Sequence, residues 1–259
     1  MKKLLTIFFL LLATACAKND KKLKIAATAV PHMEMLTFIA EDLYDQEGIE
    51  LDILVVDDYN IPNRALADGE VDANFFQHGP YLESQVKMFN YPIQSLAKIH
   101  IEPMGVYSKK ISSLADLKEK SIISLPNDPT NEARALALLH KAGIIEIDNP
   151  NNYQATVLNI SKNPKNITFI EMDASLLPRT LQDVDASIIP TNFALQADLK
   201  PRQDALLLED SSSPFANVIA IRIGDEENLR LIALKKAMTS PKMRAHILDK
   251  YKGAIEPAF

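Results

Sequence analysis

The chain of 259 residues has a single cysteine, no tryptophan and only seven glycines. One cysteine cannot form an intramolecular disulfide, so a disulfide framework is excluded. An excess of basic residues is also missing, because 28 Lys and Arg stand against 34 Asp and Glu, a formal net charge of −6. Nucleic-acid binding needs a basic surface, and the composition therefore argues against such a partner.

The sequence also lacks the common motifs of catalysis and cofactor binding. It contains no P-loop, no Gly-rich dinucleotide turn, no G-x-S-x-G elbow and no H-E-x-x-H. The five histidines are scattered without the spacing of zinc ligands. We therefore expect no enzyme, no cofactor and no metal site. One alternative stays open, a two-lobe hydrolase with Ser124 or Thr130 as nucleophile, although neither residue has a partnered base in the sequence.

A long hydrophobic run is missing as well. Residues 4–15 are uncharged and follow Lys2 and Lys3, but twelve residues are too few for a membrane span, which needs about 20 in a helix. The layout predicts a secretory signal peptide over 1–15. Cys16 follows directly and resembles the acylated cysteine of a bacterial lipoprotein box, with a polar tether over 16–22. Cleavage would leave the mature chain near −8. The alternative is a plain signal peptide with an incidental cysteine.

Strand-like and helical patterns alternate along the rest of the chain. Short apolar runs predict strands at 23–28, 49–58, 72–77, 95–108, 121–126, 166–172, 185–190, 204–210 and 217–223. Helical spacing, with caps and glycines at the ends, predicts helices at 31–47, 63–68, 80–89, 113–119, 130–142, 175–181, 192–198, 227–239 and 241–251. This alternation is typical of α/β proteins with mainly parallel sheets flanked by helices.

The number of strands predicts two lobes rather than one compact unit. We expect lobe 1 at 23–108 plus 215–259 and lobe 2 at 109–214, with the chain crossing near Ser108 and again near Ser213. Ligands of open α/β sheets bind beyond the carboxyl ends of the strands. The predicted binding site is therefore the cleft between the lobes.

Arg134 is the first candidate for ligand contact. Asp128 or Thr130 can cap the helix that follows strand 121–126, and Pro129 suits its first position. A helix start offers free N–H groups and partial positive charge, and an arginine adds a fork that matches a carboxylate. The alternative is that Arg134 pairs with Glu132 or with solvent on an exposed face.

Other polar and aromatic residues follow the strand ends. Phe75, Phe76, His78 and Tyr81 suit a pocket for a flexible apolar side chain, although at least one of the two phenylalanines is expected in the core. His100 and Glu102 border the first crossing, either at the site or as an internal pair that orders the hinge. Asn192 and Asn217 can both donate and accept hydrogen bonds, which suits a zwitterion, but asparagine is also a common cap.

Seven runs in the same order make the chain similar to the methionine-binding lipoprotein family (MetQ/NlpA type): ALADGEVDANFFQHGPYLE, HIEPMGVYSKK, LPNDPTNEARAL, NPKNITFIE, LPRTLQDVDAS, SPFANVIAIR and KGAIEPAF. The resemblance implies a type II-like periplasmic-binding-protein fold with methionine, L- and possibly D-, in the cleft. It implies delivery to the permease and ATPase of an ABC importer, from a lipid anchor on the periplasmic or outer face of a bacterial membrane.

Carried over by position, Arg134 would hold the ligand carboxylate, Asn217 the amino-acid head group and Asn192 a second polar contact. Phe75, Phe76, His78 and His100 fall in segments that line or support the side-chain pocket. The chain departs from the family at Pro190, where members often have asparagine, and at 25–29, IAATA in place of VGATP. The partner of the ligand's amino group and the ligand itself stay open. Another small ligand, such as a different amino acid, a short peptide or a metal chelate, and a surface interaction lipoprotein are the alternatives.

Overall fold

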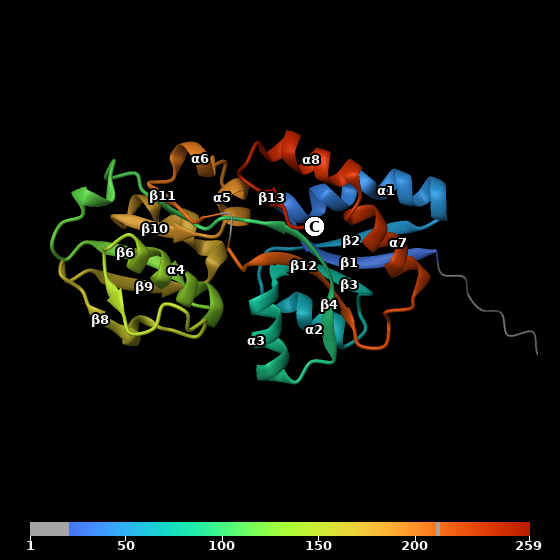
Figure 1. Ribbon diagram of the computed structural model, residues 1–259, viewed down its shortest axis with the longest axis horizontal. Coiled ribbons are helices and arrows are strands. Elements are labelled where there is room, and N and C mark those ends of the chain that lie inside the picture. The colour runs from blue at the N-terminus through green and yellow to red at the C-terminus, as the bar shows by residue number, and fades with distance from the viewer. Residues whose placement is uncertain (1–20, 211–212) are drawn as a thin grey trace, which may run out of the picture.

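The computed structural model describes residues 21–210 and 213–259, which form two lobes lying side by side (Figure 1). The predicted signal peptide, the lipidation site Cys16 and most of the tether fall outside the described residues. Within the described part of the chain, no helix is long and apolar enough to cross a membrane.

Lobe 1 is built on a six-stranded sheet in the order β13-β4-β12-β3-β1-β2. Its strands are β1 Lys22–Thr28, β2 Glu50–Val56, β3 Ala73–His78, β4 Ile93–Ile101, β12 Ala216–Arg222 and β13 Glu256–Pro257. Strands β1 to β3 pair in parallel, and β12 pairs antiparallel with both β3 and β4. β4 leaves lobe 1 and β12 returns to it, so these two neighbours must run in opposite directions.

Helices cover both faces of this sheet, as the alternation of side chains along a strand requires. They are α1 Glu34–Glu47, α2 Ile61–Ala67, α3 Gly79–Phe89, α7 Leu229–Met238 and α8 Pro241–Tyr251. Ile25 and Ala27 of β1 pack with residues of α1, α7 and α8, whereas Ala26 between them packs with residues of α2 and α3. Figure 1 shows the same division, with α1, α7 and α8 on one side of the sheet and α2 and α3 on the other.

Lobe 2 contains a five-stranded sheet in the order β11-β5-β10-β6-β9. Its strands are β5 Gly105–Tyr107, β6 Ile122–Pro126, β9 Thr168–Met172, β10 Ala186–Ile189 and β11 Leu207–Leu208. Ile123, Leu125 and Ile188 pack against α4 Pro129–Lys141 on one face. Ile189 and Tyr107 pack on the other face with the 3-10 helix Ala174–Gln182 and α5 Thr191–Gln196.

Smaller elements complete lobe 2. The short helix α6 is Pro201–Asp204, and a two-stranded sheet of β7 Glu146–Ile147 and β8 Ile160–Lys162 was not predicted from the sequence. Two short 3-10 helices are Leu114–Asp116, where a capped turn was predicted, and Val157–Asn159.

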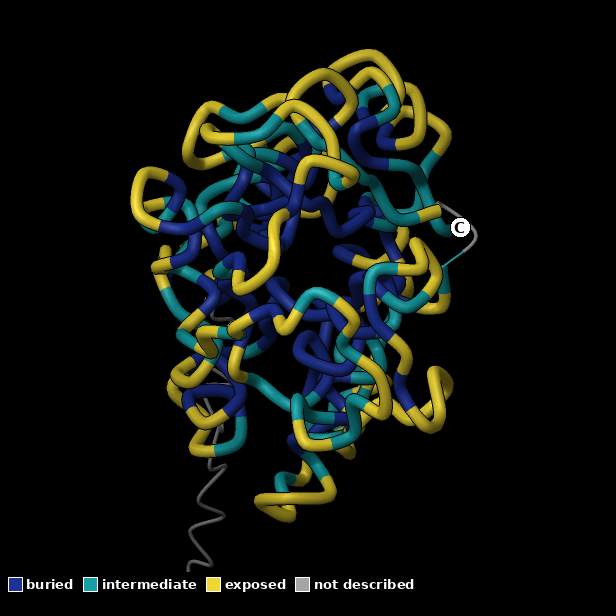
Figure 2. The backbone as a smooth tube through the Cα atoms, turned by 90° about the vertical axis from the view of Figure 1, so that its left-hand side faces the viewer, coloured by how far each residue is buried: buried dark blue, intermediate teal, exposed yellow. Residues whose placement is uncertain are grey.

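In lobe 1, the helix predicted from residue 31 begins with a π-helical turn, Ala29–Met33, before α1. When the molecule is viewed down its long axis, buried segments lie in the interior and exposed loops lie at the periphery (Figure 2).

The chain crosses between the lobes twice, after β4 and after β11. The segment predicted as one extended stretch at 95–108 is divided at 102–104, and β5 pairs with β10 of lobe 2. The first crossing therefore comes a few residues before the boundary predicted at 108. Pro103 explains the division, because proline has no N–H to donate to a sheet.

Both sheets are mixed, since antiparallel pairs surround β12 and β5, the first strands after each crossing. The expected parallel pairing is found among β1, β2 and β3 and among β6, β9 and β10, whereas β4 pairs antiparallel with β12 and β13. The carboxyl ends of the parallel strands carry the loops that meet between the lobes.

Candidate functional site

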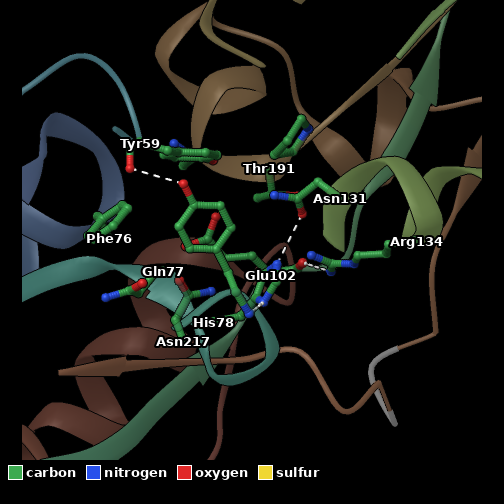
Figure 3. A pocket seen from close by; sticks show the side chains of 12 residues that line it. Tyr59, Phe76, Gln77, His78, Glu102, Asn131, Arg134, Thr191 and Asn217 are labelled. Atoms are coloured by element: carbon green, nitrogen blue, oxygen red, sulfur yellow. Dashed lines mark hydrogen bonds between the residues drawn. The ribbon is translucent and has the colours of Figure 1, made fainter. Parts of the chain in front are cut away.

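A pocket lies between the lobes at the carboxyl ends of the strands, where the alternation of strands and helices predicts it. About 340 Å³ of space not occupied by protein atoms lies in it, including the solvent-open mouth. Figure 3 shows side chains from both lobes converging on it. The lining residues are Tyr59, Phe76, Gln77, His78, Tyr81, Glu102, Asn131, Arg134, Pro190, Thr191, Asn192 and Asn217.

Arg134 enters the pocket from the second turn of α4. Asp128 caps this helix by accepting a hydrogen bond from Asn131 N at 3.0 Å, and Pro129 occupies the first turn. The Arg134 side chain is only 4% exposed. It pairs neither with Glu132 nor with solvent, so the alternative considered from the sequence is wrong.

The guanidinium of Arg134 is held on one side. Its Nε donates to both carboxylate oxygens of Glu209 at 3.1 and 3.0 Å, and Nη2 donates to the backbone carbonyl of Glu102 at 2.6 Å. The Phe215 ring lies 4.5 Å from the guanidinium carbon. Among the hydrogen bonds of the described residues, none uses Nη1. Nη1 is thus free to donate to a ligand carboxylate.

Three aromatic rings form an apolar wall on the lobe 1 side. The centroid distances are 5.8 Å for Tyr59–Phe76, 5.9 Å for Tyr59–Tyr81 and 6.0 Å for Phe76–Tyr81. Phe75, by contrast, is fully buried in the lobe 1 core. Adjacent residues of a strand face opposite sides of the sheet, and therefore only Phe76 lines the pocket.

His78 joins the lobes through a hydrogen bond whose direction can be assigned. Its Nδ1 accepts from Tyr81 N at 3.0 Å, so Nε2 carries the proton in the neutral ring. Nε2 then donates to Asn131 Oδ1 of lobe 2 at 3.1 Å, as Figure 3 shows. Burial, followed by the charge of Arg134, lowers the pKa of His78 to about 3. The ring is therefore neutral at neutral pH.

Glu102 lies beside two buried imidazoles. Its Oε1 is 2.6 Å from His100 Nε2 and 3.3 Å from His32 Nε2. Burial lowers the pKa of His32 to about 4 and that of His100 to about 3, and it raises the pKa of Glu102. The atoms of His32, His100 and Glu102 that could bind a metal ion lie within 4.8 Å of one another. Their contacts are those of a hydrogen-bond network centred on one carboxylate oxygen.

The two predicted asparagines come from different lobes. Asn192 of α5 accepts from Tyr59 Oη at 2.7 Å through Oδ1, and its Nδ2 is buried without a hydrogen-bond partner in the described protein. Asn217 of β12 places Oδ1 3.3 Å from His32 Nε2. Pro190 lines the pocket but has no hydrogen-bonding side chain, and the Thr191 hydroxyl is used by the carbonyl of Pro103.

The structure thus brings Phe76, His78, Arg134, Asn192 and Asn217 to one pocket. Phe75 and His100 lie behind the lining, in contact with each other at a centroid distance of 5.4 Å. Tyr59, Gln77 and His32 were not predicted from the sequence as site residues. Each lies at or just after the end of a strand in lobe 1, which is the signal that could have found them.

The family model described as NlpA lipoprotein matches residues 23–259. The chain belongs to this family.

Individual members of the NlpA lipoprotein family are similar over nearly the whole chain. The methionine-binding lipoprotein MetQ of Bacillus subtilis is 39% identical and is matched over 99% of each chain. A nutrient-binding protein of Burkholderia cenocepacia, solved bound to methionine, is 42% identical with a TM-score of 0.89, covering 92% of this chain and 100% of that one. A periplasmic substrate-binding protein of an ABC transporter from Coxiella burnetii is 42% identical with a TM-score of 0.86, covering 91% and 100%. The predicted two-lobe fold is confirmed.

Proposed function

We propose that this protein binds methionine, or an amino acid closely similar to it, in the interlobe pocket and delivers it to an ABC importer. The NlpA family membership and the methionine-bound relative support the proposal. The observation that carries it is that Arg134, whose Nη1 is free to donate, and the aromatic wall of Tyr59, Phe76 and Tyr81 lie in one pocket.

The ligand's two ends have different partners in this scheme. The carboxylate binds Nη1 of Arg134 and the buried Nδ2 of Asn192, a donor otherwise left unpaired at a cost of about 1–3 kcal/mol. The flexible thioether chain lies against the aromatic wall, where sulfur and ring edges attract each other. Phe75 and His100 support this wall from behind, and Asn217 contacts the head group.

Binding is coupled to closure of the lobes. Arg134 and Asn192 belong to lobe 2, whereas Tyr59, Phe76 and Tyr81 belong to lobe 1. A ligand that touches both lobes stabilises the closed arrangement over an open one. The permease and its ATPase would then distinguish the loaded protein from the empty one by its shape.

The transport role includes a lipid anchor at Cys16 that holds the mature chain to a bacterial membrane, on its periplasmic or outer face. The family description as a lipoprotein supports the anchor. Mass spectrometry of the membrane-extracted protein tests it, since acylation adds lipid mass to the N-terminal peptide and Cys16→Ser removes it.

A hydrolase is the weaker alternative on structural grounds. The Ser124 hydroxyl bonds to the hydroxyls of Ser187 and Thr180, each at 2.8 Å, and the Thr130 hydroxyl bonds to Asp128 at 3.3 Å. In these contacts, neither hydroxyl meets an imidazole or an amine that could act as its base.

The test is a thermal-shift screen of the amino acids, both methionine enantiomers, short peptides and metal chelates, followed by calorimetry on any hit. We expect methionine to bind, and Arg134→Lys to weaken binding by about 30-fold or more, because lysine keeps the charge but loses the planar fork. The control Arg179→Lys changes an exposed arginine outside the pocket and should bind as wild type. A purified protein that binds no amino acid would refute the proposal and favour a surface interaction role. Preferential binding of a peptide or a metal chelate would show that this compound, and not methionine, is the ligand.

A further inference from the structure

Among the described residues that line the pocket, Glu102 is the only acidic one. It lies in the first crossing, directly after β4, and its side chain is 6% exposed. Its backbone carbonyl accepts from Arg134 Nη2 at 2.6 Å, so the only arginine and the only acid of the lining are immediate neighbours. A buried carboxylate beside a ligand site needs compensation for the lost contact with water.

The protein supplies only part of that compensation. His32 Nε2 faces two acceptors, Glu102 Oε1 and Asn217 Oδ1, each at 3.3 Å, and therefore carries the proton. Its Nδ1 then accepts from the Thr28 hydroxyl at 2.6 Å. His100 contacts the same Oε1 through Nε2, while its Nδ1 has no partner in the described protein. Two neutral imidazoles thus orient the carboxylate without neutralising its charge.

The second carboxylate oxygen, Oε2, has no side-chain hydrogen-bond donor among the described residues. Burial raises the pKa of Glu102, and it outweighs the opposing effects of His32, of the Arg134 charge and of the backbone N–H of Asn192. A positively charged ligand group in contact with the Glu102 carboxylate would lower its pKa and favour the ionised form.

We propose that the Glu102 carboxylate receives the ammonium group of the amino-acid ligand and is the residue that restricts the site to ligands carrying a free amino group. This inference rests on the proposed function. The ammonium and carboxylate groups of an α-amino acid are attached to the same carbon, so they need adjacent partners of opposite charge, which Glu102 and Arg134 are. Asn217 Oδ1, near His32, provides a neutral acceptor beside the carboxylate.

Pro190 favours this assignment. It lines the pocket at the start of α5 but cannot hydrogen-bond through its side chain, and the neighbouring Thr191 hydroxyl is already bonded to Pro103. The described lining side chains that can accept from an ammonium include Glu102 and the asparagines. An ionised carboxylate accepts the stronger, charge-assisted hydrogen bond.

The experiment compares two ligands on the full mature chain: L-methionine and 4-(methylthio)butanoate, which has the same carboxylate and thioether but no amino group. Calorimetry with wild type should show methionine binding about 30-fold or more tightly than the desamino acid. Glu102→Gln keeps the shape and an acceptor for the imidazoles but removes the charge. We expect it to weaken methionine by a similar factor and leave the desamino acid within about threefold of wild type.

Glu132→Gln is the matched control, because Glu132 is a buried acid on α4 that accepts from Val157 N at 2.8 Å and does not line the pocket. It should leave the ratio of the two affinities unchanged. If Glu102→Gln weakened both ligands equally, or neither, Glu102 would be a structural residue and the inference would fail, with methionine binding by the wild type still intact. If wild type bound no amino acid, the proposed function itself would fail. Circular dichroism confirms that each variant is folded.

Discussion

Arg134 of α4 and Glu209 of the second crossing form a partly buried ion pair, with Nε 3.0 Å from Oε2. The same carboxylate accepts from Met104 N in the first crossing at 3.1 Å and from the Ser213 hydroxyl at 3.1 Å. The residue that faces the ligand is thus connected through one acid to both segments that join the lobes. Glu209 therefore contacts both the residue that faces the ligand and the two segments that form the hinge.

Glu209→Gln should therefore weaken methionine binding without touching the ligand. Glutamine keeps the volume but loses the charge that fixes the guanidinium, so Arg134 spends less time in the binding orientation. We expect a loss of affinity of about tenfold, ~1.4 kcal/mol, and a fall of roughly 1–3 kcal/mol in the free energy of unfolding. Calorimetry and urea unfolding measure the two effects.

Glu146→Gln is the control for this prediction. Glu146 pairs with Lys162 at 2.7 Å on the surface, with both side chains more than half exposed. Such pairs contribute about 0–1 kcal/mol, and the variant should bind methionine as wild type does. An unchanged affinity in Glu209→Gln would show that Arg134 does not need this partner.

A second prediction concerns the contact between Tyr59 and Asn192 across the cleft. The Tyr59 hydroxyl is the only donor to Asn192 Oδ1 among the side-chain hydrogen bonds of the described residues, at 2.7 Å. Tyr59→Phe keeps the aromatic wall but removes this bond and releases the Asn192 amide. We expect about five- to tenfold weaker binding, roughly 1 kcal/mol, mainly through faster dissociation.

Stopped-flow displacement of bound methionine measures that rate. Tyr44→Phe serves as control, because Tyr44 is 62% exposed on α1 and remote from the pocket lining. If Tyr59→Phe instead slowed dissociation, the hydroxyl would favour the open arrangement of the lobes.

Local signals explain why much of the fold and part of the site could be predicted. The cap, the proline and the helix that hold Arg134 all lie within a few residues of it. The alternation of a strand was enough to expect that one of Phe75 and Phe76 would be buried in the core. The strand ends indicated the cleft because chain direction follows from the order of strands and helices.

The partners of these residues could not be predicted, because they are distant in sequence. Glu209 is 75 residues from Arg134, and Tyr59 is 133 residues from Asn192. Glu209 also lies near the end of the apolar run 204–210, which predicts a strand but gives no sign of an ion pair. His32 was set aside for lack of metal-ligand spacing, yet its partners Glu102 and Asn217 come together only when the sheet forms.

His78 is a buried residue of the interlobe contact, and its titration makes the stability of the fold depend on pH. In the folded protein its pKa is lowered from 6.5 to about 3, first by burial and then by Arg134. Its Nδ1 accepts from Tyr81 N and its Nε2 contacts Asn131, so a second proton would break the first of these bonds. The unfolded chain therefore binds a proton at this residue between pH 6.5 and about 3, and the folded chain does not.

The neutral His78 consequently stabilises the fold above pH 6.5, and this contribution is lost as the pH falls from 6.5 toward about 3. Linkage sets the loss at up to about 1.4 kcal/mol per pH unit for one group. His78→Gln removes the titration while keeping a side chain that can hydrogen-bond. Urea unfolding at a series of pH values should show wild type losing its advantage over the variant as the pH drops. A constant difference between pH 7 and 4 would mean that His78 accepts its proton in the folded state almost as readily as in the unfolded chain, because burial then costs the charged ring little.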